Sequence, residues 1–276
     1  MNSYVCITGA TGGLGKAFAN ECAFRGWDLI LTDISEDNLQ SLAQGINRQY
    51  NVRVMSIPCD LSDHDDFKTF WEYINKNHIN LHMMINVAGI EFEGPFSERS
   101  IEELRTIIRL NIEGTVVMTS CALQYRDPTR ILRVINVGSL AGYYPMPVKA
   151  VYAASKRFLL DFTIALRQEY SPNEVTFTAL CPAGMPTTPR SIKGILAQGL
   201  IGKITTLNVG DVAARTIDMS LAGRNEYIPG VWNNVIRTLG SIFPPSLAAK
   251  LIRNRWKKAH KNQDLKTVNV PNKVQQ

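Results

Sequence analysis

Several features are scarce in this sequence, and each absence excludes a class of protein. The 276 residues contain no uninterrupted apolar run near the roughly 18 residues that a membrane-spanning helix needs. The first residues lack the basic start and apolar block of a secretion signal. The five cysteines are scattered without a CxxC pair, and the four histidines share no metal-ligand spacing. These absences predict a cytoplasmic protein with reduced thiols, no metal site and no transmembrane segment.

The charge is concentrated at one end of the chain. The formal net charge is +6, but residues 246–276 hold eight basic residues and one acid, so the preceding 245 residues carry −1. A neutral body gives no support to nucleic-acid binding. From Leu247, the apolar residues Leu251, Ile252 and Trp256 recur at helical spacing among the bases, which predicts a basic amphipathic C-terminal helix and tail. We expect this helix to dock on the body through its apolar stripe; the alternatives are an anionic membrane, an acidic partner or closure of a substrate pocket.

Residues 1–245 alternate between strand-like and helix-like segments. The predicted strands are Tyr4–Thr8, Asp28–Thr32, Val52–Ile57, Leu81–Val87, Ile131–Val137, Val175–Leu180 and a short one around Tyr227. The predicted helices are Lys16–Arg25, one capped by Ser35, one capped by Ser62 and ending near Lys76, Ile101–Tyr125, Val151–Tyr170 and Val209–Ala222. Apolar strands separated by helices indicate a single α/β domain: a Rossmann-type, doubly wound parallel sheet in three layers, αβα. Residues 185–207 are expected to form a substrate lid, because the stretch Ile192–Leu207 is apolar and contains three glycines.

A glycine-rich turn, TGATGGLG (Thr8–Gly15), joins the first predicted strand to the first predicted helix. Glycines let the backbone approach a pyrophosphate, and the helix start offers free N–H groups to it. The second strand ends at Asp33, whose carboxylate can accept hydrogen bonds from both hydroxyls of an adenosine ribose and would repel the 2′-phosphate of NADP. The alternative for Asp33 is a helix N-cap. No basic residue lies in the turn or directly after Asp33, so the sequence predicts NAD(H) as cofactor.

Tyr152 and Lys156 lie four residues apart at the start of a predicted helix, so their side chains share one face. A tyrosine pKa is ordinarily about 10, and a neighbouring ammonium together with a positive nicotinamide would lower it. Ser139 follows the fifth strand at the same sheet edge, where a hydroxyl can hold a substrate oxygen as charge develops on it. Each feature alone also suits an ordinary amphipathic helix or turn. Their combination predicts a catalytic group.

Together these segments resemble the short-chain dehydrogenase/reductase family of the YxxxK type over about residues 3–230. The matching motifs are Thr8–Gly15 for TGxxxGxG, Asp60-Leu61 for the adenine-contacting acid, Asn86–Gly89 (NVAG) for NNAG, Asn111 for the mid-helix Asn, Ser139, Tyr152 and Lys156 for the catalytic residues, and Pro182–Thr187 for PGxVxT. Two positions depart from the pattern. Val87 replaces the second Asn of NNAG, and Ala183 replaces the Gly after Pro182, which puts the path of that loop and the role of Thr187 in doubt.

The resemblance implies a role for each matching residue. Tyr152 would be the general acid/base, and Lys156 would bind the nicotinamide ribose and tune Tyr152. Ser139 would orient the substrate carbonyl, and Asn111 would hold a water that relays protons to Lys156. The implied cofactor-binding residues are Gly9, Thr11, Gly12, Gly13, Leu14, Gly15, Asp33, Asp60, Leu61, Asn86, Ala88, Gly89, Tyr152, Lys156, Pro182 and Thr187.

The expected activity is an NAD(H)-dependent interconversion of a secondary alcohol and a ketone. Resemblance to hydroxysteroid dehydrogenases suggests a bulky apolar ketone such as a steroid as substrate. The alternatives are a long-chain 3-ketoacyl reductase, or a non-catalytic dinucleotide-binding regulator with a membrane-surface tail. The helix from Ile101 and the helix bearing Tyr152, with Phe158, Leu159 and Phe162, are expected to pair two copies into a homodimer or homotetramer. Tyr143, Tyr144 and Met146 follow Ser139 in a loop that is expected to border the substrate, and a half-exposed loop patch is the alternative.

Overall fold

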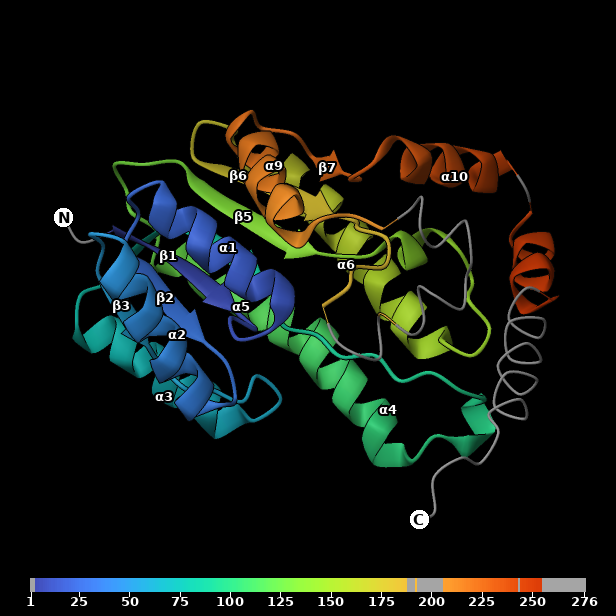
Figure 1. Cartoon of the computed structure of the whole chain (residues 1–276), viewed down its shortest axis with the longest axis horizontal. Coiled ribbons are helices and arrows are strands. Elements are labelled where there is room, and N and C mark those ends of the chain that lie inside the picture. Colours follow the sequence, from blue (N-terminus) through green and yellow to red (C-terminus); the bar gives the residue numbers. More distant parts are fainter. Residues whose placement is uncertain (1–2, 188–191, 193–205, 243, 255–276) are drawn as a thin grey trace, which may run out of the picture.

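Seven parallel strands form one sheet in the order β3-β2-β1-β4-β5-β6-β7, which confirms the doubly wound topology (Figure 1). The structure, a computed structural model, describes residues 3–187, 192, 206–242 and 244–254. The strands are β1 (Ser3–Thr8), β2 (Leu29–Thr32), β3 (Val54–Ser56), β4 (Asn80–Asn86), β5 (Leu132–Val137), β6 (Val175–Leu180) and β7 (Glu226–Tyr227). The helices of the body are α1 (Gly13–Phe24), α2 (Glu36–Gln49), α3 (His64–Lys76), α4 (Ile101–Ile108), α5 (Thr115–Gln124), α6 (Ala150–Glu169) and α9 (Val209–Leu221).

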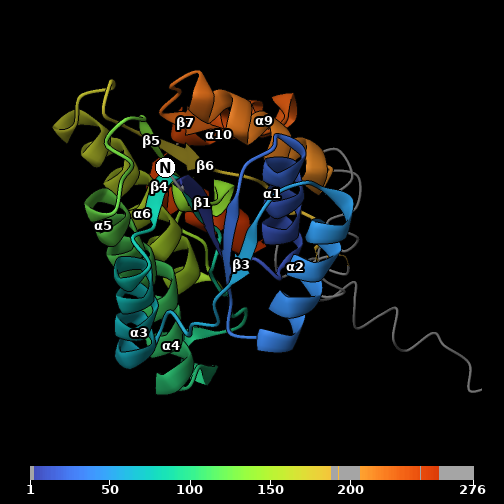
Figure 2. The same cartoon turned by 90° about the vertical axis from the view of Figure 1, so that its left-hand side faces the viewer.

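The sheet is buried on both faces because its strands carry apolar residues on alternating sides. Val5 and Ile7 of β1 join a core with α1, α2 and α9, whereas Tyr4 and Cys6 join a core with α3 and α5. Figure 2 shows α1 and α2 on one side of the sheet and α3, α4, α5 and α6 on the other. The three layers follow from strands that are apolar throughout their length.

The strand order reverses between β1 and β4, and this places the loop after β1 against the loop after β4. Gly9 has a φ of +61°, and a Cβ on it would lie 2.8 Å from the backbone of Ala88. Thr8 Oγ1 accepts hydrogen bonds from the backbone N–H groups of Val87 and Ala88. Ligands of open parallel sheets bind at such a reversal, outside the carboxyl ends of the strands. The fold therefore predicts a ligand site at the carboxyl edge of the sheet, between the loops after β1 and β4.

The helix expected over Ile101–Tyr125 is interrupted. Ser100 and Glu103 form a reciprocal capping box at the start of α4, and a π-helical turn, Arg109–Gly114, then separates α4 from α5. A π-helical turn accommodates one extra residue and is common at functional sites. A second correction concerns α3, whose cap is Asp63 rather than Ser62, because the Asp63 carboxylate accepts the N–H groups of Asp65 and Asp66.

The chain beyond β7 forms a helix that the sequence did not predict, α10 (Val231–Ile242), followed by a further helix over residues 245–254. The Tyr144 hydroxyl donates to the Ile236 carbonyl at 2.7 Å, and the guanidinium of Arg237 lies over the Tyr143 ring. These two tyrosines therefore hold α10 in place, a contact that the sequence analysis did not predict for them. Of the apolar stripe expected to dock the C-terminal helix, Leu247 and Leu251 are exposed and Ile252 is half-buried.

Other expectations can be compared directly with the structure. Leu159 is buried, so of the residues expected to pair copies through α6 only Phe158 is exposed. The lid expected over residues 185–207 lies largely outside the described residues, as does Trp256. In the described part of the chain all five cysteines are free, no cluster could hold a metal ion, and no helix is both long and apolar enough to cross a membrane.

Candidate active site

The predicted catalytic residues converge at the carboxyl edge of the sheet. Tyr152 and Lys156 lie on successive turns of α6, and the Lys156 Nζ lies 5.9 Å from the centre of the Tyr152 ring. Lys156 is only 4% exposed, and its ammonium donates to the Val137 carbonyl at the end of β5 at 2.8 Å. Ser139 follows two residues later, and its hydroxyl accepts the backbone N–H of Ala141. Residues from β5, its following loop and α6 thus meet at one place.

Burial dominates the electrostatics of this group. It raises the pKa of Tyr152 to about 12, to which the negative charge of Glu91 adds, while a hydrogen bond with Ser139 acts in the opposite direction. It lowers the pKa of Lys156 to about 8. The expected lowering of the tyrosine pKa needs the positive nicotinamide as well as Lys156, and in the chain without cofactor the loss of water around the phenolate dominates. Burial thus moves the pKa values of these two neighbouring groups apart, and shifted ionisable groups that lie together are a common mark of a functional site.

Asn111 occupies the π-helical turn and is fully buried. Its Oδ1 accepts the N–H of Ile90 at 2.8 Å, and its Nδ2 donates to the Ile90 carbonyl and to Ser155 Oγ. Ser155 Oγ in turn donates to the carbonyl of Tyr152. Asn111 therefore ties the loop after β4 to the helix that carries Tyr152 and Lys156.

A cluster that the sequence analysis missed stands beside Tyr152. Lys149, which directly precedes α6, places its Nζ 3.2 Å from Glu91 and 3.0 Å from Glu93 on the loop after β4. The same loops are joined by a hydrogen bond from the Gly94 N–H to the carbonyl of Val148, which has a φ of +64°. Two acids spaced by two after the NVAG segment, with a lysine three residues before the tyrosine, are the signal that could have indicated it.

The glycine turn fits a dinucleotide. A Cβ on Gly13 would lie 2.7 Å from Thr187 Cβ, so the first residues of the expected lid pack directly on this turn. A Cβ on Gly15 would overlap the Gly9 carbonyl oxygen. Helix α1 begins without a side-chain cap and has no acid in its first turn, which leaves backbone N–H groups for a pyrophosphate.

Asp33 faces this turn and does not cap α2. Its Oδ2 accepts the backbone N–H of Thr11 at 2.9 Å and the Thr11 hydroxyl at 2.7 Å, while its Oδ1 accepts the N–H of Ile34. Ser35 precedes α2 and makes no side-chain cap hydrogen bond. The carboxylate is therefore fixed beside the glycine turn, and the alternative of a helix N-cap is excluded.

The remaining predicted cofactor residues differ in how they are placed. Asp60 Oδ1 accepts from the N–H and hydroxyl of Ser62, and the side chain of Leu61 is buried in the core. Asn86 is buried, and its amide donates to Asn136 and Thr119 inside the protein. Gly89 lies against the catalytic group, because a Cβ on it would be 3.2 Å from both Asn111 Oδ1 and Lys156 Nζ.

The loop after β6 is tied to the catalytic serine. The Pro182 carbonyl accepts the N–H of Leu140, which directly follows Ser139, at 2.9 Å. Together with the contact between Thr187 and Gly13, this bond links the catalytic loop to the glycine turn through residues 182–187. The substitution of Ala183 for the glycine at this position leaves that connection intact.

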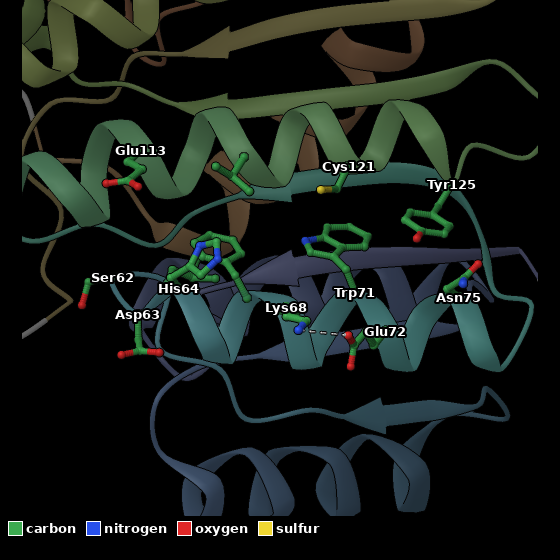
Figure 3. Close-up of a pocket in the computed structure, with 13 residues that line it drawn as sticks. Ser62, Asp63, His64, Lys68, Trp71, Glu72, Asn75, Glu113, Cys121 and Tyr125 are labelled. Carbon is green, nitrogen blue, oxygen red and sulfur yellow. Dashed lines mark ion pairs between the residues drawn. The ribbon is translucent and has the colours of Figure 1, made fainter.

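A separate hollow of about 390 Å³ lies between α3 and α5 (Figure 3). Trp71 and Tyr125 stack there with ring centres 5.4 Å apart, and Lys68 pairs with Glu72 on the outside of α3. Leu61 lines this hollow, but none of Asn111, Ser139, Tyr152 and Lys156 does. It is not the active site.

Comparison with known proteins agrees with this geometry. The family model described as short chain dehydrogenase matches residues 3–193. Sulfoacetaldehyde reductase 2 of Chromohalobacter salexigens is 34% identical over 194 residues, covering 68% of this chain and 74% of the relative. Human 17-beta-hydroxysteroid dehydrogenase type 3 is 29% identical, and the match covers 68% of this chain and 60% of the relative. Mouse very-long-chain 3-oxoacyl-CoA reductase is 24% identical, and the match covers 95% of this chain and 84% of the relative. A short-chain dehydrogenase from Sphingobium yanoikuyae in complex with NADPH has the same fold, with a TM-score of 0.72, 20% identity and coverage of 99% and 98%.

The chain belongs to the short chain dehydrogenase family. It is an oxidoreductase of the class that acts on alcohols and ketones and uses a dinucleotide cofactor. The glycine turn, the uncapped start of α1 and Asp33 are the residues of this chain that fit such a cofactor.

Proposed function

We propose that this protein interconverts a secondary alcohol and a ketone with NAD(H), using Tyr152 as general acid/base. The observation that carries the proposal is the convergence of Ser139, Tyr152 and Lys156 beside the glycine turn at the carboxyl edge of the sheet. A non-catalytic dinucleotide-binding regulator would not need a buried lysine beside a half-buried tyrosine and a serine at this edge.

The roles of the side chains follow from their positions. The cofactor, when bound, supplies or accepts the hydride. The Ser139 hydroxyl donates to the substrate oxygen, and Tyr152 gives it a proton in reduction or takes one in oxidation. Lys156 places a positive charge near the phenol, which favours the phenolate in the oxidation direction. Asn111 positions this pair through Ser155, and we propose that it also supports the water that relays protons to Lys156.

The choice of NAD(H) rests on Asp33. Its carboxylate is fixed beside the glycine turn by Thr11, where the ribose hydroxyls of NAD would share its oxygens and a 2′-phosphate would meet a negative charge. The turn TGATGGLG itself contains no basic residue to offset that charge.

The cofactor proposal is tested by comparing NADH with NADPH in the same assay. We expect a preference for NADH of at least about tenfold in kcat/KM, which corresponds to roughly 1.4 kcal/mol. Asp33→Ala should shrink this preference, whereas Asp37→Ala, which removes an exposed acid on α2, should leave it unchanged. Equal use of both cofactors by the unmodified protein would contradict the proposal.

We further propose a bulky apolar ketone such as a steroid as the substrate, supported by the similarity to a 17-beta-hydroxysteroid dehydrogenase. A long-chain 3-oxoacyl substrate is the second candidate, favoured by the alignment of a 3-oxoacyl-CoA reductase over 95% of this chain. A panel of steroid ketones, 3-oxoacyl thioesters and sugar ketones, followed at the nicotinamide absorbance, separates the two. Turnover confined to sugar ketones would contradict both.

We also propose that the protein is a cytoplasmic homodimer or homotetramer. Free, mostly buried cysteines support a reducing compartment. Ile101 and Ile108 on α4 and Phe158 on α6 are exposed apolar residues on the two helices expected to pair. Light scattering that shows only a 30.8 kDa species at micromolar concentration would contradict the assembly.

A further inference from the structure

The chain beyond β7 exposes an unusual amount of apolar surface, which we call the C-terminal face. It comprises Val231, Trp232, Val235 and Ile242 on α10 together with Leu247 and Leu251 on the helix over residues 245–254. Val231 is 79% exposed, Ile242 71% and Trp232 59%. Large apolar side chains that gather on one surface usually mark an interaction site, whereas isolated ones do not.

The apolar residues of α10 form one stripe. At 3.6 residues per turn, positions 231, 232, 235 and 242 fall within an arc of about 100°. The opposite side holds the helix in place: Tyr144 donates to the Ile236 carbonyl, and Arg237 lies over the Tyr143 ring and 3.8 Å from Glu226. The body thus binds α10 through one face, and the apolar stripe is left facing outward.

All charged residues in the sequence from 227 to 263 are basic. Between Glu226 and Asp264 the sequence contains no acidic residue but seven basic ones: Arg237, Lys250, Arg253, Arg255, Lys257, Lys258 and Lys261. Lys250 and Arg253 are exposed on the same helix as Leu247 and Leu251. By contrast, α4 carries charges of both signs, and Glu102 pairs there with Arg105.

We propose that the C-terminal face docks the protein on the surface of an anionic lipid bilayer. Trp, Val, Ile and Leu would enter the headgroup boundary, and the bases would bind the anionic headgroups, which is how an interfacial amphipathic helix binds. A second copy fits less well, because a two-fold contact would place the same bases against one another. An acidic protein would need an apolar groove of matching shape to accept this stripe, whereas a bilayer accepts an exposed amphipathic helix without a shaped partner.

The C-terminal face lies close to the catalytic loop. Helix α10 packs against the short helix Leu140–Tyr143, which directly follows Ser139. A bilayer on the outer side of α10 would therefore lie on the catalytic-loop side of the molecule. Binding to the bilayer does not depend on the proposed reaction, so the two can be tested separately.

The test is flotation of the full chain with two kinds of vesicle. One is phosphatidylcholine alone, and the other replaces about a quarter of it with phosphatidylserine. We expect at least tenfold stronger binding to the anionic vesicles and a loss of most of that difference at high salt. A blue shift of tryptophan fluorescence on vesicle binding that is absent in Trp232→Phe would place α10 itself in the bilayer.

Two pairs of variants separate the face from the rest of the chain. The double variant Trp232→Ser/Val235→Ser should weaken vesicle binding at least tenfold, whereas Phe24→Ser/Leu221→Ser, which removes exposed apolar residues from α1 and α9, should not. Lys250→Glu/Arg253→Glu should also weaken vesicle binding, because it reverses two charges that face the headgroups. Lys68→Glu on α3 should leave vesicle binding unchanged. Thermal unfolding of every variant checks that the fold is retained.

Three outcomes would overturn the proposal. The first is equal or undetectable binding to both vesicles at low salt. The second is binding that the α10 variants leave unchanged while deletion of residues 255–276 abolishes it, because the basic tail alone would then be responsible. The third is a dimer in light scattering that dissociates in the Trp232→Ser/Val235→Ser variant without any vesicle binding.

Discussion

The carboxyl and amino edges of the sheet both bury ionisable side chains, but with different results. At the amino edge, His82 Nδ1 lies 3.2 Å from Ser3 Oγ, and the His82 ring meets Trp27 edge-on with centres 5.7 Å apart. Burial, with Arg130 nearby, lowers the pKa of His82 to about 4. At the carboxyl edge, burial lowers the pKa of Lys156 to about 8, beside a second ionisable group, Tyr152.

The difference shows what burial alone can and cannot do. At the amino edge it removes a charge altogether, so His82 is neutral at any physiological pH and contributes to packing. At the carboxyl edge it leaves a cation whose pKa is near the working pH, next to a phenol that can exchange a proton. A cavity of about 470 Å³ lined by Ser3, Trp27 and His82 shows that the presence of space is not the distinction. The two edges differ because the carboxyl edge brings two ionisable side chains, Tyr152 and Lys156, next to each other.

The largest effect should come from removing the phenol at the carboxyl edge. Tyr152→Phe keeps the ring and its packing but deletes the group that transfers a proton, so kcat should fall at least about a hundredfold. NADH affinity should change little, since Asp33 and the glycine turn remain. Lys156→Ala should impair both turnover and NADH binding. Near-normal turnover by Tyr152→Phe, measured with a ketone and NADH, would contradict the assignment.

The next effect belongs to the amino edge and concerns stability. Because His82 titrates near 4 when folded and near 6.5 when unfolded, the unfolded chain takes up the proton first as the pH falls. Folding stability is therefore lost progressively below about pH 6.5, by about 2 kcal/mol at pH 5 from this residue.

This loss is measured by urea unfolding of the wild type and of His82→Leu at pH 7 and pH 5. The variant should lose about 2 kcal/mol less than the wild type over that interval, and turnover at pH 7 should stay within about twofold. An identical pH dependence in the two proteins would show that His82 is protonated in the native state.

A smaller effect is expected from the cluster of Lys149, Glu91 and Glu93. Lys149→Met leaves two carboxylates near Tyr152 without their cation, so the pKa of the phenol should rise further. Alcohol oxidation needs the phenolate, so its rising pH limb should move upward and its rate at neutral pH should fall about tenfold.

Two variants make this prediction specific. Lys149→Met combined with Glu91→Gln should restore part of the pH profile, because it removes the acid that acts on Tyr152. Arg157→Met, which breaks an exposed ion pair with Asp161 on the same helix, should leave the profile in place. A lower rate with an unshifted pH profile would mean that Lys149 supports only the loop structure.

The sequence was most informative where local chemistry and periodicity act together. The strand order, the glycine turn and the meeting of Ser139, Tyr152 and Lys156 follow from apolar strands and from the rule that parallel strands present their carboxyl ends at one edge. The raised pKa of Tyr152 could not be predicted, because it depends on burial and on Glu91, which approaches from another loop.

Helix α10 escaped prediction for a related reason. Its segment contains two asparagines and a glycine, which are weak helix formers. The helix is held by tertiary contacts: Asn233 donates to the Pro229 carbonyl, and Tyr144 binds the Ile236 carbonyl from far along the chain. The cap of α3 differs by one residue from its prediction because Ser62 and Asp63 are both good caps, and Ser62 is already bound to Asp60.

The π-helical turn Arg109–Gly114 also determines how this chain would respond to a change in length. Because that turn holds one residue more than an α-helical turn, the faces of α4 and α5 are offset by about 100°. Deleting one residue there would let the two helices merge into one regular helix with uniform hydrogen bonds. The same deletion would rotate Asn111 away from Ile90 and Ser155. A chain one residue shorter would therefore form a more regular helix but would lose the contacts of Asn111. The extra residue is what holds the catalytic loop in place.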